Sequence, residues 1–195
     1  KHGEKLFSNL KLSKISTISK IYNLHNLCKI YGTLPFANIA RMAFIAVEFL
    51  NSMIELKIIT PLEKSNFLES NKSISLDMKR ILKKNKRLFF EKFGHLRPNT
   101  YEISNLNYKD NFKNYFISED LSSKKRRVFK FSTKQKEKIN FYLKTNGFKK
   151  INFEKLYYFI TNSIYQREAS KLFFTKIINE IFIQLKILSK RIGLK

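Results

Sequence analysis

The sequence predicts an all-α protein: an irregular multi-helix bundle of about six to eight helices with one long loop crossing it. Apolar residues recur at the three- and four-residue spacing of helices over most of the chain. No alternating apolar and polar run is long enough to predict a strand, and only five Gly and three Pro interrupt the 195 residues. An apolar content of 43% suffices for a folded core, so we expect one helical domain over residues 1–195.

The first third of the chain predicts two helical regions that are separated at a glycine. Residues 4–31 carry leucine and isoleucine at helical spacing, and Gly32 ends that run. Leu34-Pro35 opens the next element, and the spacing from Phe36 to Ile54 keeps one apolar stripe over about five turns. This second helix is apolar around most of its circumference, so we expect it at the centre of the bundle.

Two pairs of charged residues interrupt apolar helical patterns. Arg41 and Glu48 lie on one face of the second helix, and charges on a buried helix are usually paired. Either they form an internal ion pair, or Arg41 points into a pocket and meets an anion. A similar choice holds for Arg167 and Glu168 near the C-terminus, which either pair with each other in solvent or line a cavity.

The middle of the chain predicts two further helices. Thr60-Pro61-Leu62-Glu63 has the pattern of a capping box with proline at the first helical position, so a short helix begins at residue 61. Residues 70–75 are typical of a turn. Residues 75–93 form the next expected helix, whose lysines and arginines lie on its outer, solvated face.

A long loop and two helices complete the expected fold. Residues 104–128 have no helical period and include the basic run Lys124–Arg127, so we expect a long loop there. Ser132-x-x-Gln135 caps a helix that Gly147 ends. Residues 153–192 keep a helical pattern almost throughout.

The candidate site is the stretch of residues 94–108, because it combines a Gly, a Pro, a His, an Arg and a carboxylate in a helical chain. Gly94 can end the preceding helix in a left-handed conformation, and Pro98 biases Arg97 away from the helical region. The resulting stiff segment presents five polar side chains to a site: His95, Arg97, Thr100, Tyr101 and Glu102. The alternative is that Gly94 and Pro98 only end a helix and that these side chains are solvated or capping.

A net charge of +24 makes a nucleic-acid partner the first alternative to consider. Only 8 of the 39 basic residues are arginine, however, and the abundant Lys, Asn, Ile, Phe and Tyr are residues that an AT-rich genome favours. Arginine is the residue that planar phosphate and base recognition prefers, so we do not expect nucleic acid to be the partner. A basic helical module using Lys79–Lys92 and Lys124–Arg127 stays the alternative function, and a structural or interaction domain is a third.

Other compositional features limit the location and the chemistry. No apolar run reaches 18 residues, so we expect no membrane span. The single Cys28 suits a reducing compartment, and we expect a cytoplasmic protein. The sequence has no Gly-rich phosphate loop and no Cys or His cluster at metal-ligand spacing. We therefore expect no metal and no cofactor in this domain, and no complete catalytic apparatus.

Three segments, residues 32–46, 93–103 and 167–175, resemble in order the central helical region of the phosphoenolpyruvate synthase, pyruvate phosphate dikinase and rifampin phosphotransferase family. The most specific part is Gly-His-Leu-Arg-Pro at residues 94–98. The family's segment continues Gly-Thr-Tyr-Asp-Ile, so Asn99 and Glu102 depart from it. Asn tolerates a left-handed backbone, so the turn can survive, whereas the longer Glu102 carboxylate can shift a contact.

The resemblance implies an ATP-dependent phosphotransferase in which an ATP-grasp domain, a mobile phosphohistidine domain and an acceptor-binding region cooperate. This chain resembles the acceptor-binding region, a fragment of a larger multidomain chain, as its start at Lys1 also suggests. ATP and Mg²⁺ then belong to the parent enzyme, and the partner of this domain is a small-molecule phosphate acceptor.

The expected roles of the site residues follow from their chemistry. Arg97 and Arg41 hold the acceptor's anionic or hydroxylated end, with Thr100 and Tyr101 beside them. His95 and Glu102 orient a hydroxyl or remove its proton as catalytic groups. Arg167 and Glu168 form the opposite wall.

Overall fold

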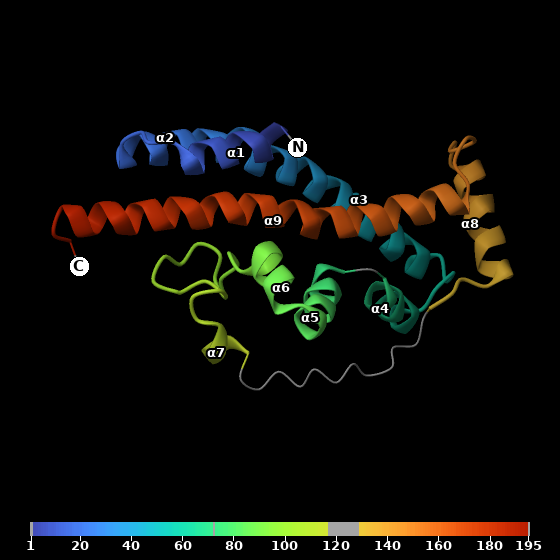
Figure 1. Ribbon diagram of the computed structural model, residues 1–195. Coiled ribbons are helices and arrows are strands. Elements are labelled where there is room, and N and C mark those ends of the chain that lie inside the picture. The colour runs from blue at the N-terminus through green and yellow to red at the C-terminus, as the bar shows by residue number, and fades with distance from the viewer. Residues whose placement is uncertain (1, 72, 117–128, 195) are drawn as a thin grey trace.

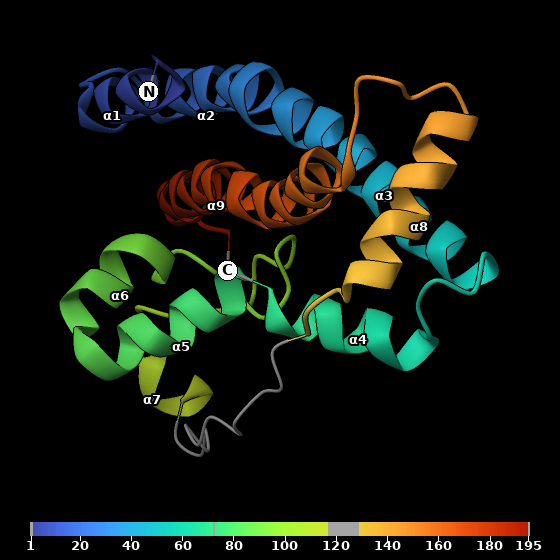
Figure 2. The ribbon, with the colours of Figure 1, turned by 90° about the vertical axis from the view of Figure 1, so that its right-hand side faces the viewer.

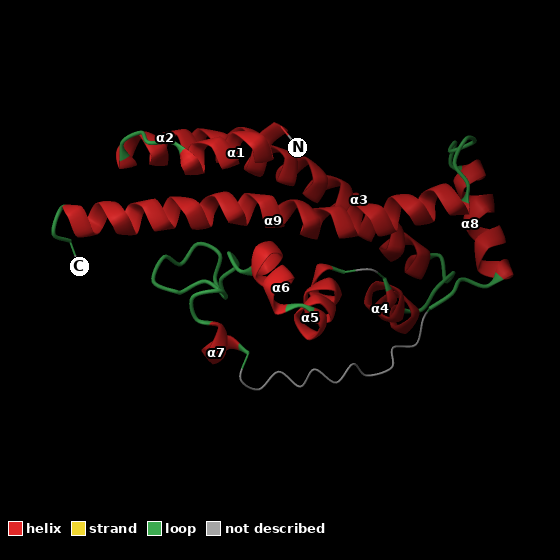
Figure 3. Ribbon diagram, in the orientation of Figure 1, coloured by secondary structure: helices red, strands yellow, loops and turns green. Residues whose placement is uncertain are grey.

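The computed structural model describes residues 2–71, 73–116 and 129–194. Throughout these ranges the ordered elements are helices, and no strand occurs in them (Figure 3). The predicted all-α class is therefore confirmed. The basic run Lys124–Arg127 lies outside the described residues.

The longest helix, α9 (Phe153–Arg191), forms the central axis of the fold. Its 39 residues span roughly 58 Å at the usual helical rise. Figures 1 and 2 show α9 lying between two layers, with α1, α2 and α3 on one side and α4 to α7 on the other. The expectation that residues 36–54 form the central helix is wrong, because α9 is the helix that packs against both layers.

The N-terminal layer consists of α1 (His2–Leu12), α2 (Thr17–Leu27) and α3 (Leu34–Glu55). A π-helical turn, η1 (Cys28–Thr33), joins α2 to α3 without a break, so the expected helix end at Gly32 is wrong. The wider turn accommodates Pro35, which has no N–H for the helical ladder. Gly32 lies close to α9, since a Cβ there would lie 3.3 Å from the Phe174 ring, a tight contact.

One face of α3 is exposed in spite of its apolar composition. The Phe44 side chain is 62% exposed, and Met42 and Ile45 are also exposed. By length and composition alone, residues 17–55 could cross a membrane, with 17% of the most apolar window buried in the fold. Core helices of soluble proteins pass the same test, so the expected absence of a membrane span and the expected cytoplasmic location stay predictions.

The opposite layer contains α4 (Pro61–Ser70), α5 (Ile74–Lys84) and α6 (Lys86–Phe93). The predicted capping box is confirmed: Thr60 Oγ1 accepts from Glu63 N at 3.1 Å, and Thr60 N donates to Glu63 Oε2 at 2.7 Å. The single helix expected over residues 75–93 is wrong, because α5 ends at Lys84 and Asn85 has an extended backbone. The Asn85 side chain accepts from Leu88 N at 2.9 Å and so starts α6 as a new helix.

In its described part, up to residue 116, the loop after α6 contains one short helix, α7 (Phe112–Tyr115). Helix α8 (Thr133–Thr145) begins at the predicted Ser132–Gln135 capping box and is followed by Gly147, whose φ of +87° is left-handed as expected. Two apolar cores result. The first joins α3, α4, α8 and the start of α9, and the second joins α1, α2 and Phe174 and Ile177 of α9.

Candidate functional site

The loop that follows α6 folds back on itself and lies against α9. Tyr108 N donates to Leu96 O at 2.8 Å, and Lys109 N donates to Gly94 O at 3.0 Å, so the two ends of the predicted site segment are joined. Gly94 has a φ of −59°, and the expected left-handed conformation is wrong. Glycine is required by close packing, because a Cβ there would lie 2.5 Å from Phe90 O.

A hollow of about 480 Å³ lies between this loop, α1, α6 and α9. Its volume falls in the range of small-molecule sites. Most of its lining is polar or charged, unlike the apolar walls of a typical ligand pocket. The polar lining residues are Lys11, Glu91, His95, Asn107, Lys109, Asp110, Lys176, Asn179 and Glu180.

His95 is the predicted site residue that lines this hollow, and its protonation state follows from its contacts. Its Nε2 lies 3.1 Å from Thr175 Oγ1, and Thr175 donates its own proton to Lys171 O at 2.8 Å. Because Thr175 gives its proton to a backbone carbonyl, its oxygen can accept from Nε2, and the ring has a further backbone hydrogen bond to Leu172. Burial, together with the charge of Lys176, lowers the pKa of His95 to about 4. The imidazole is therefore neutral at pH 7.

Arg97 is buried behind the wall of the hollow and does not line it. Its Nη2 donates to Asn179 Oδ1 at 2.9 Å, its Nη1 donates to the Asn105 carbonyl, and its guanidinium stacks over Phe182 at 5.2 Å. Burial lowers the pKa of Arg97. We expected Arg97 to hold the acceptor directly; in the structure it fastens the loop to α9 and orients Asn179.

Asn179 links the buried guanidinium to the surface of the hollow. Its Oδ1 also accepts from Asn107 Nδ2 at 3.3 Å, and both asparagines are buried. Among the described residues, Arg97 Nε is a buried side-chain nitrogen without a hydrogen-bond partner. These hydrogen bonds hold the side-chain amides of Asn107 and Asn179 in place at the wall of the hollow.

Two of the carboxylates that line the hollow are already neutralised. Glu180 is buried and lies 3.8 Å from Lys11 Nζ, and Gln184 donates to it at 2.9 Å. Glu91 lies 3.3 Å from Arg87 Nε. These carboxylates therefore contribute little net negative charge to a ligand in the hollow.

Two lysines of the hollow, Lys109 and Lys176, have no carboxylate within 4.0 Å among the described residues. Asp110 also lines the hollow, and its charge raises the pKa of Arg97, against the larger effect of burial. The lining itself holds three lysines and three carboxylates, but Arg87 and Arg97, which lie outside the lining, offset Glu91 and Asp110. With these two arginines counted, the charges around the hollow are positive in excess beside a neutral imidazole, which favours an anionic ligand.

The other residues predicted on the loop do not reach the hollow. Glu102 is exposed and accepts from Ser104 Oγ at 2.7 Å and from Ser104 N at 3.2 Å, and these bonds lower its pKa. Tyr101 is exposed and makes an edge contact with the Phe174 ring. Thr100 is half-buried but is not part of the lining.

The predicted residues on helices also lie elsewhere. Arg41 is exposed on α3, where it donates to Asn38 Oδ1 at 3.5 Å, and Glu48 accepts from Asn51 rather than from Arg41. Arg167 and Glu168 pair with each other at 2.7 Å, which is the first of the two alternatives for them. The structure therefore brings His95 into the hollow without Arg41, Arg167 or Glu168.

Sequence reasoning missed the lysines that give the hollow its charge. Lys11, Lys109 and Lys176 stand in no motif and are indistinguishable from the other lysines of the sequence. One signal was present: Asn179-Glu180 interrupts the apolar pattern of the last helix, and both side chains are buried. Buried polar residues in an apolar helix indicate a partner on a neighbouring element.

Comparison with family models, with curated proteins and with solved structures finds no match to this chain. The likeness to the phosphoenolpyruvate synthase family therefore rests on the three sequence segments alone.

Proposed function

We propose that this chain binds a small phosphorylated or carboxylated molecule in the hollow between α6 and α9. In the parent enzyme it would be the acceptor-binding domain of an ATP-dependent phosphohistidine-relay phosphotransferase. The observation that carries the first part is the pair Lys109 and Lys176, which lack a carboxylate partner in the described structure and flank the same hollow as His95. The sequence resemblance alone supports the second part.

Ligand charge would couple directly to the chemistry of His95. The charge of Lys176 helps to keep the pKa of this imidazole low. An anion bound to Lys176 offsets that charge and moves the pKa of His95 back toward its ordinary value of about 6.5. His95 would then become a better proton acceptor when the acceptor molecule is bound, as a general base requires.

The remaining parts of the relay belong to other domains. By the resemblance, an ATP-grasp domain would supply ATP and Mg²⁺, and a mobile domain would carry the phosphate on its own histidine. No residue of this chain is assigned to the nucleotide, the metal or the carrier histidine. The contribution of this domain would be to hold the acceptor against the hydrogen-bonded side chains of Asn107 and Asn179 in the wall of the hollow.

The binding test uses the 195-residue chain and ligands of defined charge. We expect inorganic phosphate, phosphoglycerate and pyruvate to shift the amide NMR signals of residues around His95, and uncharged glycerol to leave them unchanged. Lys176→Met, which keeps the apolar stem, should weaken phosphate binding about fivefold or more. Lys190→Met at the exposed end of α9 is the matched control and should not. Equal binding by both variants would refute the assignment.

The alternative of a nucleic-acid module is tested by the same material. The lysines near the junction of α5 and α6, among them Lys79, Lys83, Lys84 and Lys86, are exposed and could contact phosphates. In that case binding of a duplex or single strand should fall steeply with added salt and should be insensitive to Lys176→Met. Weak binding with a shallow salt dependence would instead favour the small-anion site.

A further inference from the structure

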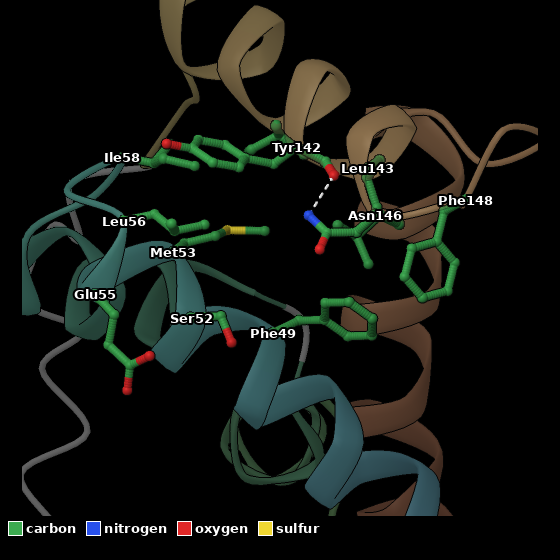
Figure 4. Close-up of a pocket in the computed structure, with 12 residues that line it drawn as sticks. Phe49, Ser52, Met53, Glu55, Leu56, Ile58, Tyr142, Leu143, Asn146 and Phe148 are labelled. Atoms are coloured by element: carbon green, nitrogen blue, oxygen red, sulfur yellow. Dashed lines mark hydrogen bonds between the residues drawn. The ribbon is translucent and has the colours of Figure 1, made fainter.

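A second hollow, separate from the one at His95, lies between the C-terminal end of α3 and helix α8 (Figure 4). It has a volume of about 540 Å³. Its walls are mainly apolar and come from segments far apart in the sequence: Phe49, Met53, Leu56, Tyr142, Leu143 and Phe148. A concave, largely apolar site with a few polar groups is the usual form of a small-molecule site.

The hollow opens directly onto the first apolar core. Met53, Leu143 and Leu156 belong to that core, are buried, and also line the hollow. At the mouth, Leu56 is 40% exposed and Phe148 is 43% exposed. A ligand would therefore place an apolar body against rigid, well-packed side chains and would cover two exposed apolar residues.

The polar groups of this hollow offer acceptors for hydrogen bonds. Ser52 gives its proton to Glu48 O at 2.9 Å, which leaves its oxygen lone pairs free. Asn146 Nδ2 donates to Tyr142 O at 2.9 Å (Figure 4), which leaves Oδ1 as an acceptor. The Glu55 carboxylate has no hydrogen-bond or ion-pair partner among the described residues.

Among the described lining residues Glu55 is also the one that is charged, so the hollow differs in the sign of its charge from the strongly basic chain. The net charge of the chain is +24, yet the lysines next to these segments in sequence, Lys57 and Lys144, do not line the hollow. The groups that a ligand in the hollow would contact are therefore acceptors and one carboxylate, which favour a ligand that donates hydrogen bonds and carries positive charge.

We propose that this hollow binds an apolar amine, a molecule with an aromatic or branched aliphatic body and a protonated primary amino group. The body would lie on Met53, Leu143 and Phe148, and the ammonium group would lie at the α3 side of the hollow, where Ser52 and Glu55 offer acceptors. The site is thus selective for the opposite ligand charge to the hollow at His95. It does not depend on the function proposed for that hollow.

The test compares three ligands that share one body. On the 195-residue chain, 4-phenylbutylamine should bind at least about fivefold more tightly than 4-phenylbutanol, and 4-phenylbutyrate should bind most weakly. The amide NMR signals that move should be those around Met53, Leu143 and Phe148. Equal or tighter binding of the acid, signal changes confined to other regions, or no measurable binding of the amine would overturn the proposal.

Variants separate the charge from the apolar body. Glu55→Gln should weaken amine binding about threefold to fivefold and leave the alcohol unchanged. Glu48→Gln on the same helix, outside the hollow, should change neither. Phe148→Ala removes an exposed wall residue and should weaken all three ligands. A Glu55→Gln variant that keeps the full preference for the amine would also refute the proposal.

Discussion

The pKa of His95 makes a quantitative prediction about stability. In the folded chain this pKa is about 4, because the ring is largely buried and lies near Lys176, whereas in the unfolded chain it should be about 6.5. Between these values the unfolded state binds more protons than the folded state, so stability falls as the pH falls from 6.5 to 4. At 1.36 kcal/mol per pKa unit, the loss attributable to His95 is about 3 kcal/mol.

The measurement is urea unfolding of the wild type and of His95→Gln, followed by circular dichroism at several pH values from 4 to 7. Glutamine keeps a polar group near Thr175 but does not titrate. We expect the free energy of unfolding of the variant, relative to wild type, to rise by about 3 kcal/mol as the pH is lowered over this range. Taking the difference removes the carboxylates, which titrate in both proteins.

His25→Gln on the exposed side of α2 is the matched control, since it leaves His95 in place and should keep the wild-type slope. If the difference between His95→Gln and wild type is the same at pH 4 and pH 7, then the imidazole is not held neutral by burial. The role of His95 as a neutral proton acceptor in the hollow would lose its support with it.

Three further predictions concern the packing and the loop. Gly94→Ala should destabilise the fold by about 1–3 kcal/mol in urea unfolding, because the new Cβ meets the backbone oxygen of Phe90; no loss would show that the loop can shift. Thr60→Ala should cost about 1 kcal/mol through the lost cap, whereas Ser65→Ala within the same helix should cost less than half of that. In the phosphotransferase proposed above, Arg97→Met should lower acceptor turnover about tenfold or more while phosphorylation of the proposed carrier histidine persists; unchanged turnover would show that fastening the loop to α9 is not needed.

The starts of several helices could be predicted because they depend on neighbours in the sequence. Thr60 and Glu63, and Ser132 and Gln135, form their reciprocal bonds within one turn, so their pattern is sufficient. The break at Asn85 is equally local but was missed. A single Asn inside an amphipathic pattern is compatible with a helix interior as well as with a cap.

The candidate site was predicted only in part. His95 was identified from the unusual composition of its segment, and the structure places it in a hollow. Its companions there, Lys11, Lys109 and Lys176, come from α1, the loop and α9, and no spacing rule relates them. Conversely, Arg41, Arg167 and Glu168 were selected because they interrupt apolar patterns, but each finds solvent or a neighbour on its own helix.

The sequence by itself determined that the chain is helical, where most helices begin, and which loop interrupts them. The apolar spacing and the capping side chains act over one or two turns, so their effect does not depend on the rest of the fold. Only the tertiary structure decided that α9 is the central helix, that α3 keeps an exposed apolar face, and that lysines distant in sequence surround His95. These features depend on which surfaces pack together, and apolar burial is non-directional, so the pattern of one helix does not specify its partner.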